Sequence, residues 1–409
     1  MPRTRSTPAG PASPALVPLL IALSTLTPVA LNLTVPSLPA IAADLNAPYR
    51  LIQLSVTVFL VSVALAQLAL GPLSDRYGRR PILLAGIGLF VLGSLGSALA
   101  GGVESLLAAR IIQAAGGCAG MVLARAIIQD QYGRDHGAAV LGSITMAVAV
   151  APMLAPPLGG YLELWVGWRA GFLGLALLGG LILAWTAFGL AETGRRGGGG
   201  EIRRDLLPLI RLGAFWRYSL VVALSNGVFF AFLGAAPLVA ATSFGMSPQA
   251  YGSSFMLVAG GFIMGNFVSA RRSRRVGPLR MIRIGVALAL LAAGLIVLGA
   301  VTTGLSPLWL FGPMILSAIA NGLITPNGLA AAISLRPDIA GTTAGLAGAI
   351  QMGVGAAASA GAGFLIDGGT GAARGEALAW LMLGLAGLAA MLGMWRDAAA
   401  PAPVQPEQA

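Results

Sequence analysis

The sequence contains no lysine, so all 25 of its basic residues are arginines. A phosphate-binding loop of the G-x-x-x-x-G-K-S/T type, which needs a lysine, is therefore excluded. Cys118 is the single cysteine, which rules out an internal disulfide, and His136 is the single histidine, which leaves no cluster of metal ligands. These absences predict a protein that is not an enzyme and that carries no metal and no cofactor.

Charge is also scarce, because only 10% of the 409 residues are charged while 57% are hydrophobic. A soluble domain carries about 25% charged residues. Apolar segments of roughly 20 residues instead match a hydrocarbon layer about 30 Å thick, in which helices are favoured because they satisfy their own backbone. Twelve such segments are predicted, at 15–37, 51–73, 81–100, 103–126, 138–161, 168–190, 216–241, 249–270, 280–302, 307–330, 341–366 and 375–395.

The first apolar segment has an alternative interpretation as a cleaved signal peptide. Arg3 and Arg5 would form its basic start, and the small residues 40–42 would form its cleavage site. Its apolar part is longer than the core of a usual signal peptide, which favours a membrane span.

The arginines are distributed unevenly over the connections between these segments. With the N-terminus inside, 21 of them fall in inner segments, whereas the outer segments hold only Arg50, Arg169 and Arg374. This bias follows the positive-inside rule and places both termini in the cytoplasm, as expected for a multi-pass protein of a bacterial-type cytoplasmic (inner) membrane. The net charge of +11 is then explained by topology, and no nucleic-acid partner is expected.

The longest break between segments predicts an all-α integral membrane protein built from two six-helix bundles. The break contains four consecutive glycines, Gly197–Gly200, beside charged residues, which is typical of a flexible linker. Six segments on each side indicate two related repeats. The predicted parts are an N-terminal tail at 1–14, a bundle at 15–190, a linker at 191–215, a second bundle at 216–395 and a C-terminal tail at 396–409.

Small residues recur every fourth position in the fifth and the eleventh segments. Small residues on one helical face let two helices approach closely, so these stripes are predicted to be surfaces on which the two bundles move. The stripes are Ala147, Ala151, Ala155 and Gly159 in the fifth segment, and Gly345, Ala349, Gly353, Ala357 and Gly361 in the eleventh.

The connection between the second and third segments carries a helix stop, a flexible glycine and several fixed cations in the run 71–81. Its residues 71–80 match motif A of the major facilitator superfamily, G-x-L-(S/A)-D-R-x-G-R-(R/K), at every defined position. Three further stretches resemble that superfamily's drug:proton antiporters of the Bcr/CflA type. The matching positions are Gly71, Asp75, Arg76, Gly78, Arg79 and Arg80 in motif A, Arg110 and Gln113 in motif B, Asp130 at the end of helix 4, and Pro152, Pro156, Gly159 and Gly160 in motif C.

The resemblance implies a twelve-helix major facilitator fold and a role for each motif. Asp75 is expected to accept hydrogen bonds from the start of helix 11, near Gly341 and Thr342, and Arg79 or Arg80 is expected to pair with Asp130. These contacts would latch the cytoplasmic side shut. The alternative is that the arginines only set the topology.

Arg110 is the most costly residue inside a predicted span. One interpretation directs it into a central cavity beside Gln113, where the resemblance implies a role in proton coupling; the other lets it reach outward to water. The three prolines 152, 156 and 157 similarly permit a hinge or a static bend in helix 5.

The sequence departs from the family pattern in helix 1, where relatives often carry an acidic residue and this chain carries Asn32. An amide cannot carry a titrating proton, so proton coupling is implied by the resemblance alone. Glu163 and Asp367 are the remaining candidates for a proton carrier.

We therefore expect a monomeric transporter that exports small hydrophobic or amphiphilic drug-like compounds in exchange for protons by alternating access. The alternatives are an uptake carrier or facilitator for a small metabolite without proton coupling, and a membrane receptor or scaffold without transport. Candidate residues for the substrate cavity are Asn32, Gln53, Phe59, Gln113, Met146, Asn226, Phe229, Phe230, Asn321, Asn327, Gln351 and Met352.

Overall fold

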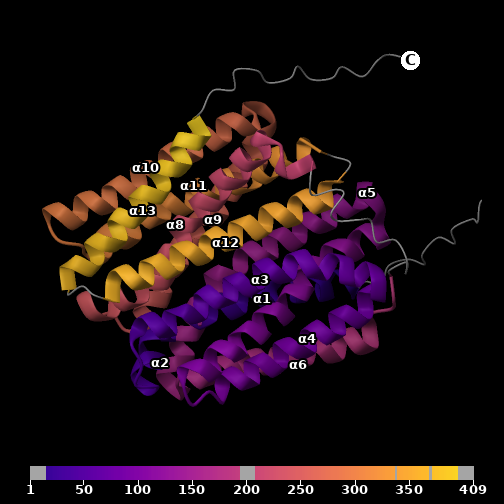
Figure 1. The fold of residues 1–409 in the computed structure, drawn as a ribbon, viewed down its shortest axis with the longest axis horizontal. Coiled ribbons are helices and arrows are strands. Elements are labelled where there is room, and N and C mark those ends of the chain that lie inside the picture. The colour runs from indigo at the N-terminus through magenta and orange to yellow at the C-terminus, as the bar shows by residue number, and fades with distance from the viewer. Residues whose placement is uncertain (1–14, 194–207, 337–338, 368–370, 395–409) are drawn as a thin grey trace, which may run out of the picture.

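The computed structural model of the chain describes residues 15–193, 208–336, 339–367 and 371–394, and the regular structure within these ranges is helical (Figure 1). The first half contains α1 (Leu16–Leu33), the short helix η1 (Val35–Ser37), α2 (Leu38–Asp44), α3 (Tyr49–Tyr77), α4 (Arg79–Ala98), α5 (Val103–Val166) and α6 (Trp168–Gly189). The second half contains α8 (Gly213–Ser243), α9 (Pro248–Val276), α10 (Pro278–Thr302), α11 (Pro307–Ser334), α12 (Ala340–Asp367) and α13 (Gly371–Met394).

Twelve of the described helical segments are long and apolar enough to cross a membrane, which confirms the number of predicted spans. The first span runs through α1, η1 and α2, and α5 contains two spans, Val103–Tyr132 and Ile144–Val166. An even number of crossings places the start of α1 and the end of α13 on the same side of the membrane.

The prediction of a loop between the fourth and fifth spans is wrong, because the helical assignment of α5 continues through residues 127–143. The prolines of α5 all come later, at 152, 156 and 157, so no proline stops the helix at this connection. His136, which lies between the predicted segments 103–126 and 138–161, falls among α5 residues whose side chains are outside the described part of the structure.

The helices form two bundles, one from each half of the chain (Figure 1). In the first, α1, α3 and α4 pack against α5, and α6 packs against α4; in the second, α8 packs against α12 and α13, and α11 against α9 and α10. The main contacts between the bundles join α3 to α12 and α5 to α9. Most of the predicted linker, at 194–207, lies outside the described residues, whereas its last residues already belong to α8.

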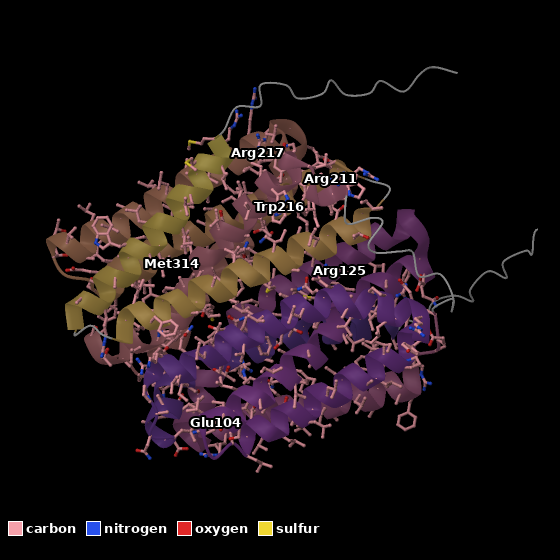
Figure 2. The ribbon with its side chains drawn as sticks, viewed as in Figure 1. Glu104, Arg125, Arg211, Trp216, Arg217 and Met314 are labelled. Atoms are coloured by element: carbon pink, nitrogen blue, oxygen red, sulfur yellow. The ribbon has the colours of Figure 1, made fainter. Side chains whose placement is uncertain are left out.

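The two ends of the bundles differ in charge. The arginine-rich face comprises the end of α3 with Arg76, the start of α4 with Arg79 and Arg80, and the end of α9 with Arg274 and Arg275. The opposite face comprises the starts of α3, α5 and α9 and the ends of α2 and α5. Figure 2 shows Arg211 and Arg217 at one end of the molecule and Glu104 at the other.

Close helix packing depends on glycine at several contacts. A Cβ at Gly116 of α5 would collide with the backbone of α4 at Gly86 and Phe90, and one at Gly120 would collide with Leu23 of α1. Lipid gives no hydrophobic drive for helices to associate, so such backbone approaches are a main source of packing energy in a membrane.

The prediction that the small-residue stripe of the eleventh span is a packing surface is wrong for its three glycines. A Cβ at Gly345, Gly353 or Gly361 of α12 would meet nothing within 4 Å. The packed glycines of α12 are instead at 348, 355 and 363, which face Gln67, Phe230 and Gln53. A spacing of four residues drifts about 40° per step around a helix of 3.6 residues per turn, so five such positions leave one face.

The equivalent stripe of α5 does lie in the packed interior. Ala151 is 7% exposed, Ala155 is 2% exposed, and a Cβ at Gly159 would collide with the carbonyl oxygen of Leu33 at the end of α1. Within this stripe, Gly159 therefore packs α5 against α1 of its own bundle.

Candidate transport site and its gates

The turn between α3 and α4 is built around Gly78, whose φ of 102° favours glycine. The carboxylate of Glu192, which follows α6, accepts hydrogen bonds from the backbone N–H groups of Arg79 (2.9 Å) and Arg80 (3.3 Å). A Cβ at Gly78 would lie 2.6 Å from Glu192 Oε2. A carboxylate at a helix start satisfies free N–H groups and the helix dipole, so Glu192 fixes this turn to the end of α6.

Arg79 is the centre of the motif A contacts. Its Nη1 lies 2.6 Å from Asp75 Oδ1 and also donates to the Ser74 hydroxyl, and its Nε lies 3.3 Å from Asp130 Oδ2. The expected pairing with Asp130 is present, and it ties the start of α4 to the middle of α5.

The expected contact between Asp75 and the start of α12 is absent from the interactions of the described residues. Asp75 bonds to Arg79, while a Cβ at Gly341 would meet nothing within 4 Å. In this structure, therefore, the predicted latch between Asp75 and residues 341–342 is open.

Arg80 lines a surface cavity beside the same turn. Its Nη2 donates to the carbonyl of Ala187 at 2.7 Å, which adds a second tie between α4 and α6. The cavity measures about 470 Å³ and is also lined by Pro81 and residues 187–192.

Arg110 lies inside the first bundle and is 1% exposed, which contradicts the interpretation that it reaches outward to water. Its Nη1 donates to Gln113 Oε1 and, at 3.3 Å, to the carbonyl of Ala30. Its guanidinium lies over the rings of Phe59, at 4.3 Å from the centroid, and Phe172, at 5.7 Å.

The Arg110 network continues through Gln113 into α4. Gln113 Nε2 donates to Ser94 Oγ at 2.8 Å, and Ser94 Oγ donates to the Phe90 carbonyl at 2.7 Å. Side chains or backbone groups of α1, α3, α4, α5 and α6 thus meet at one buried cation. Among the described residues, no carboxylate forms an ion pair with it.

Asn32 is 2% exposed, and its Nδ2 donates to the Pro28 carbonyl one turn earlier at 2.8 Å. Its Oδ1 is buried without a partner. The position at which the resemblance implies an acid thus holds a buried amide, which has no titrating proton.

The second bundle contains a buried amide network that sequence reasoning found only in part. Asn226 Nδ2 donates to Thr325 Oγ1 at 3.1 Å, Thr325 Oγ1 donates to Asn321 Oδ1 at 2.7 Å, and Asn321 Nδ2 donates to Asn226 Oδ1 at 3.3 Å. This closed triangle joins α8 to α11. Thr325 was missed because a lone threonine in an apolar span carries no pattern.

The sequence motif of the first bundle is not repeated at the end of α9, where Arg274 stands three residues before Gly277 as Asp75 stands three residues before Gly78. Asn327 Nδ2 donates to Ser269 Oγ at 2.7 Å, and the Ser273 hydroxyl donates to Asn327 Oδ1. The end of α9 is thus held to α11 by neutral hydrogen bonds where the first bundle uses ions.

Aromatic rings gather in the second bundle around α8 and α9. Phe229, a predicted cavity residue, meets Phe230 at 5.6 Å and Phe255 at 5.9 Å between ring centroids. Phe232 and Tyr251, which the sequence did not single out, belong to the same cluster and contact Phe255.

Three other predicted cavity residues occupy different environments. Phe59 is fully buried against Arg110, whereas Met146 is 68% exposed. Gln351 lines a cavity of about 10 Å³ between α8, α11 and α12, which is the size of one water molecule. The structure therefore does not bring these residues into one cavity.

The bundles meet closely near the face opposite the arginines. Tyr49 Oη donates to the Gly234 carbonyl at 2.9 Å, and Gln53 Nε2 donates to the carbonyl and hydroxyl of Ser359 at 2.7 and 2.6 Å. All three bonds join α3 to the second bundle. Gln53 was predicted to line a cavity, but it is 1% exposed and serves this contact.

Two glycines make the other contact between the bundles, between α5 and α9. A Cβ at Gly160 would lie 2.6 Å from the Pro248 carbonyl, and a Cβ at Gly252 would lie 2.6 Å from the Pro156 carbonyl. Pro156 and Gly160 belong to the predicted motif C. We call this reciprocal contact, with Pro156, Gly160, Pro248, Gln249 and Gly252, the α5–α9 seam.

Two membrane-embedded bundles that meet at a glycine seam near one face, with an ionic turn at the other face, define a multi-pass α-helical transporter. The sequence family model described as Major Facilitator Superfamily matches residues 20–360. The chain belongs to this superfamily, and it is a membrane transporter of small-molecule substrates.

Similar sequences carry resistance names. The chain is 32% identical over 327 residues to a chloramphenicol resistance protein of Pseudomonas aeruginosa, covering 79% of this chain and 76% of the relative. It is 31% identical over 343 residues to a bicyclomycin resistance protein homolog of Haemophilus influenzae, covering 82% and 85%. These relatives agree with the resemblance to the Bcr/CflA type.

Solved structures share the fold. A D-xylose–proton symporter matches with a TM-score of 0.77 at 18% identity, covering 93% of this chain and 96% of that one. A bacterial homolog of the human lysosomal transporter Spinster, solved inward-facing and unoccupied, matches with a TM-score of 0.75 at 18% identity, covering 94% and 97%.

Proposed function

We propose that this chain exports small hydrophobic or amphiphilic drug-like compounds across a bacterial inner membrane by proton-driven alternating access. The observation that carries the proposal is that the two bundles are in contact at one face and lack the expected contact at the other. The seam near one face is closed, while at the other face Asp75 bonds to Arg79 and not to α12. Relatives named for resistance to chloramphenicol and bicyclomycin support the substrate class.

Several features complete the proposal. The arginine-rich face is cytoplasmic, both termini lie there, and the protein acts as a monomer whose bundles at 15–190 and 216–395 are joined by the linker at 191–215. The bias of arginines to one face supports this orientation. The described structure is then open toward the cytoplasm.

The proposed substrate cavity draws on two groups of side chains in the second bundle. The aromatic cluster with Phe229 and the amide triangle with Asn226 and Asn321 offer rings and neutral polar groups. Rings and neutral polar groups of this kind suit varied lipophilic solutes.

Drug sensitivity tests the function directly. Cells that lack their own exporters and express this chain are expected to tolerate several-fold more of a neutral amphiphilic drug than cells with the empty vector. A protonophore should abolish this protection and restore intracellular accumulation. Efflux that survives a collapsed proton gradient would remove proton coupling from the proposal.

Uptake without proton coupling is the second candidate, and Asn32 is the observation that favours it. In inverted membrane vesicles, export in the cell becomes uptake into the vesicle. A proton gradient that drives the drug into such vesicles supports antiport, whereas gradient-independent movement of a metabolite supports the second candidate.

Asp75→Asn is expected to abolish most transport while leaving the protein folded. The Asp75–Arg79 ion pair is partly exposed and joins two residues that are four apart in the sequence. Its loss should therefore lower the free energy of unfolding by less than about 1 kcal/mol. The proposed latched state, however, needs the carboxylate to accept bonds from the start of α12. Drug efflux at matched membrane abundance measures the effect, with Glu104→Gln as the control, and full activity of Asp75→Asn would contradict the latch.

A further inference from the structure

A partly buried acid at the end of α5, Glu163, has no role in the contacts described so far. Glu163 is part of the second span of α5, close to the face opposite the arginines. It follows Gly160 by three residues and Gly159 by four, so the helix places it on the side that carries these two glycines. Gly160 faces α9 and Gly159 faces the end of α1, which directs Glu163 toward the junction of the two bundles.

The surroundings of Glu163 leave one of its oxygens unsatisfied. Ser37 of η1, a residue that is 4% exposed, is the polar neighbour of the Glu163 side chain. Glu163 Oε2 is buried without a hydrogen-bond partner, and it is the one carboxylate oxygen among the described side chains with this property. The amide oxygen of Gln249, the second residue of α9, is also buried without a partner.

Two acceptors without a donor form an unfavourable arrangement in a dry contact. Protonation of Glu163 changes this, because the neutral carboxyl group costs less free energy to bury than the carboxylate and gains an O–H that can donate. Separation of α5 from α9 also changes it, because water then reaches the ionised carboxylate. The closed seam therefore favours the proton-bound form of Glu163, and the open seam favours the ionised form.

Other titratable groups on the neighbouring elements are already engaged or neutral. Asp44 at the end of α2 lies 2.7 Å from Arg169 of α6 and accepts from Trp168. Tyr49 of α3 donates to Gly234, and Tyr251 of α9 packs its ring in the aromatic cluster while its hydroxyl is buried without a hydrogen-bond partner. Arg50 of α3 has its own interaction.

We propose that Glu163 is a proton-binding residue that couples closure of the α5–α9 seam to protonation from the side opposite the arginines. The proposal rests on the proposed exporter function for its role in transport: with Asn32 in place of the helix 1 acid, Glu163 supplies a site at which proton binding changes the conformation. In such an exporter, the outward-open seam takes up a proton and then closes.

Distances between spin labels across the seam test this coupling. We would attach labels at Leu164→Cys of α5 and Ala250→Cys of α9, which are both exposed positions, in a Cys118→Ala background. Pulsed electron paramagnetic resonance in lipid vesicles would follow the ratio of separated to closed seams from about pH 5 to pH 9, where buried carboxyls titrate. For one linked proton this ratio should rise by up to about tenfold per pH unit.

Variants assign the response to Glu163. Glu163→Gln should keep the seam closed at every pH, whereas Glu104→Gln, which neutralises an exposed acid at the same face, should respond as the parent does. Ser37→Ala should move the midpoint to higher pH, because it removes the polar neighbour that favours the ionised carboxylate. An unchanged response in Glu163→Gln, a lost response in Glu104→Gln or an unmoved midpoint in Ser37→Ala would each overturn the proposal.

The same samples separate this inference from the proposed function. The distance measurement needs no substrate, so it reports on Glu163 even if the drug assays fail. A pH-dependent seam without drug efflux would contradict the exporter function and support the coupling to Glu163. Drug efflux with a pH-insensitive seam would support the exporter function and contradict the coupling.

Discussion

Replacing Arg110 by alanine is expected to eliminate transport and to destabilise the first bundle. The change leaves Gln113 Oε1 and the Ala30 carbonyl without their donor, and it removes the cation that lies over Phe59 and Phe172. Each buried hydrogen bond to a charged group contributes about 1.5 to 3 kcal/mol, so the loss is a large share of a typical stability. Efflux and thermal unfolding in detergent would measure the two effects.

Arg110→Lys is the matched comparison for this prediction. Lysine keeps the charge but lacks the planar guanidinium that lies over the Phe59 ring while Nη1 donates to Gln113 and Ala30. We expect partial recovery of stability with transport still reduced. If Arg110→Ala exports drug at the parent rate, the buried network has no part in the transport cycle.

We expect the variants Gly159→Ala and Gly160→Ala to lose function for different reasons, although the two glycines are neighbours in the sequence. A Cβ at Gly159 would enter the Leu33 carbonyl inside the same bundle, so Gly159→Ala should reduce folding and membrane abundance. A Cβ at Gly160 would lie 2.6 Å from the Pro248 carbonyl of the other bundle, so Gly160→Ala should leave each bundle intact and hold the seam apart.

The expected result for Gly160→Ala is normal abundance with most transport lost, since a carrier that cannot close one gate cannot cycle. Label distances across the seam and efflux at matched abundance would measure it. Gly174→Ala is the control, because a Cβ there would meet nothing within 4 Å. Equal behaviour of the Gly159 and Gly160 variants would contradict the assignment of the two glycines to different contacts.

The contacts of the motif A turn could be predicted from the sequence only in part. The run 71–80 and the pairing of Arg79 with Asp130 followed from a pattern that is contiguous in sequence apart from one acid. Glu192, which caps α4 from 113 residues away, had no such pattern. A lone glutamate after a span is indistinguishable from a solvated residue until the end of α6 is placed beside the start of α4.

The small-residue stripes show the same limit in the membrane-spanning helices. Composition correctly indicated that small residues mediate helix packing, as Gly116 and Gly120 do. It did not identify the packed face of α12, where the glycines at 348, 355 and 363 make the contacts. Which face of a helix is buried depends on the helices packed around it. In an alanine- and glycine-rich span several faces carry small residues, so the sequence does not identify the packed one.

The sequence by itself determined the number of spans, their helical state and the position of the ionic turn, because the length of an apolar run and the placement of arginine act through local solvation. The tertiary structure alone decided which face is closed, why Gly159 and Gly160 differ, and how Arg110 and Glu163 are buried. Those properties depend on which backbone or side chain from a distant helix excludes water from each group, and no local pattern of residues contains that information.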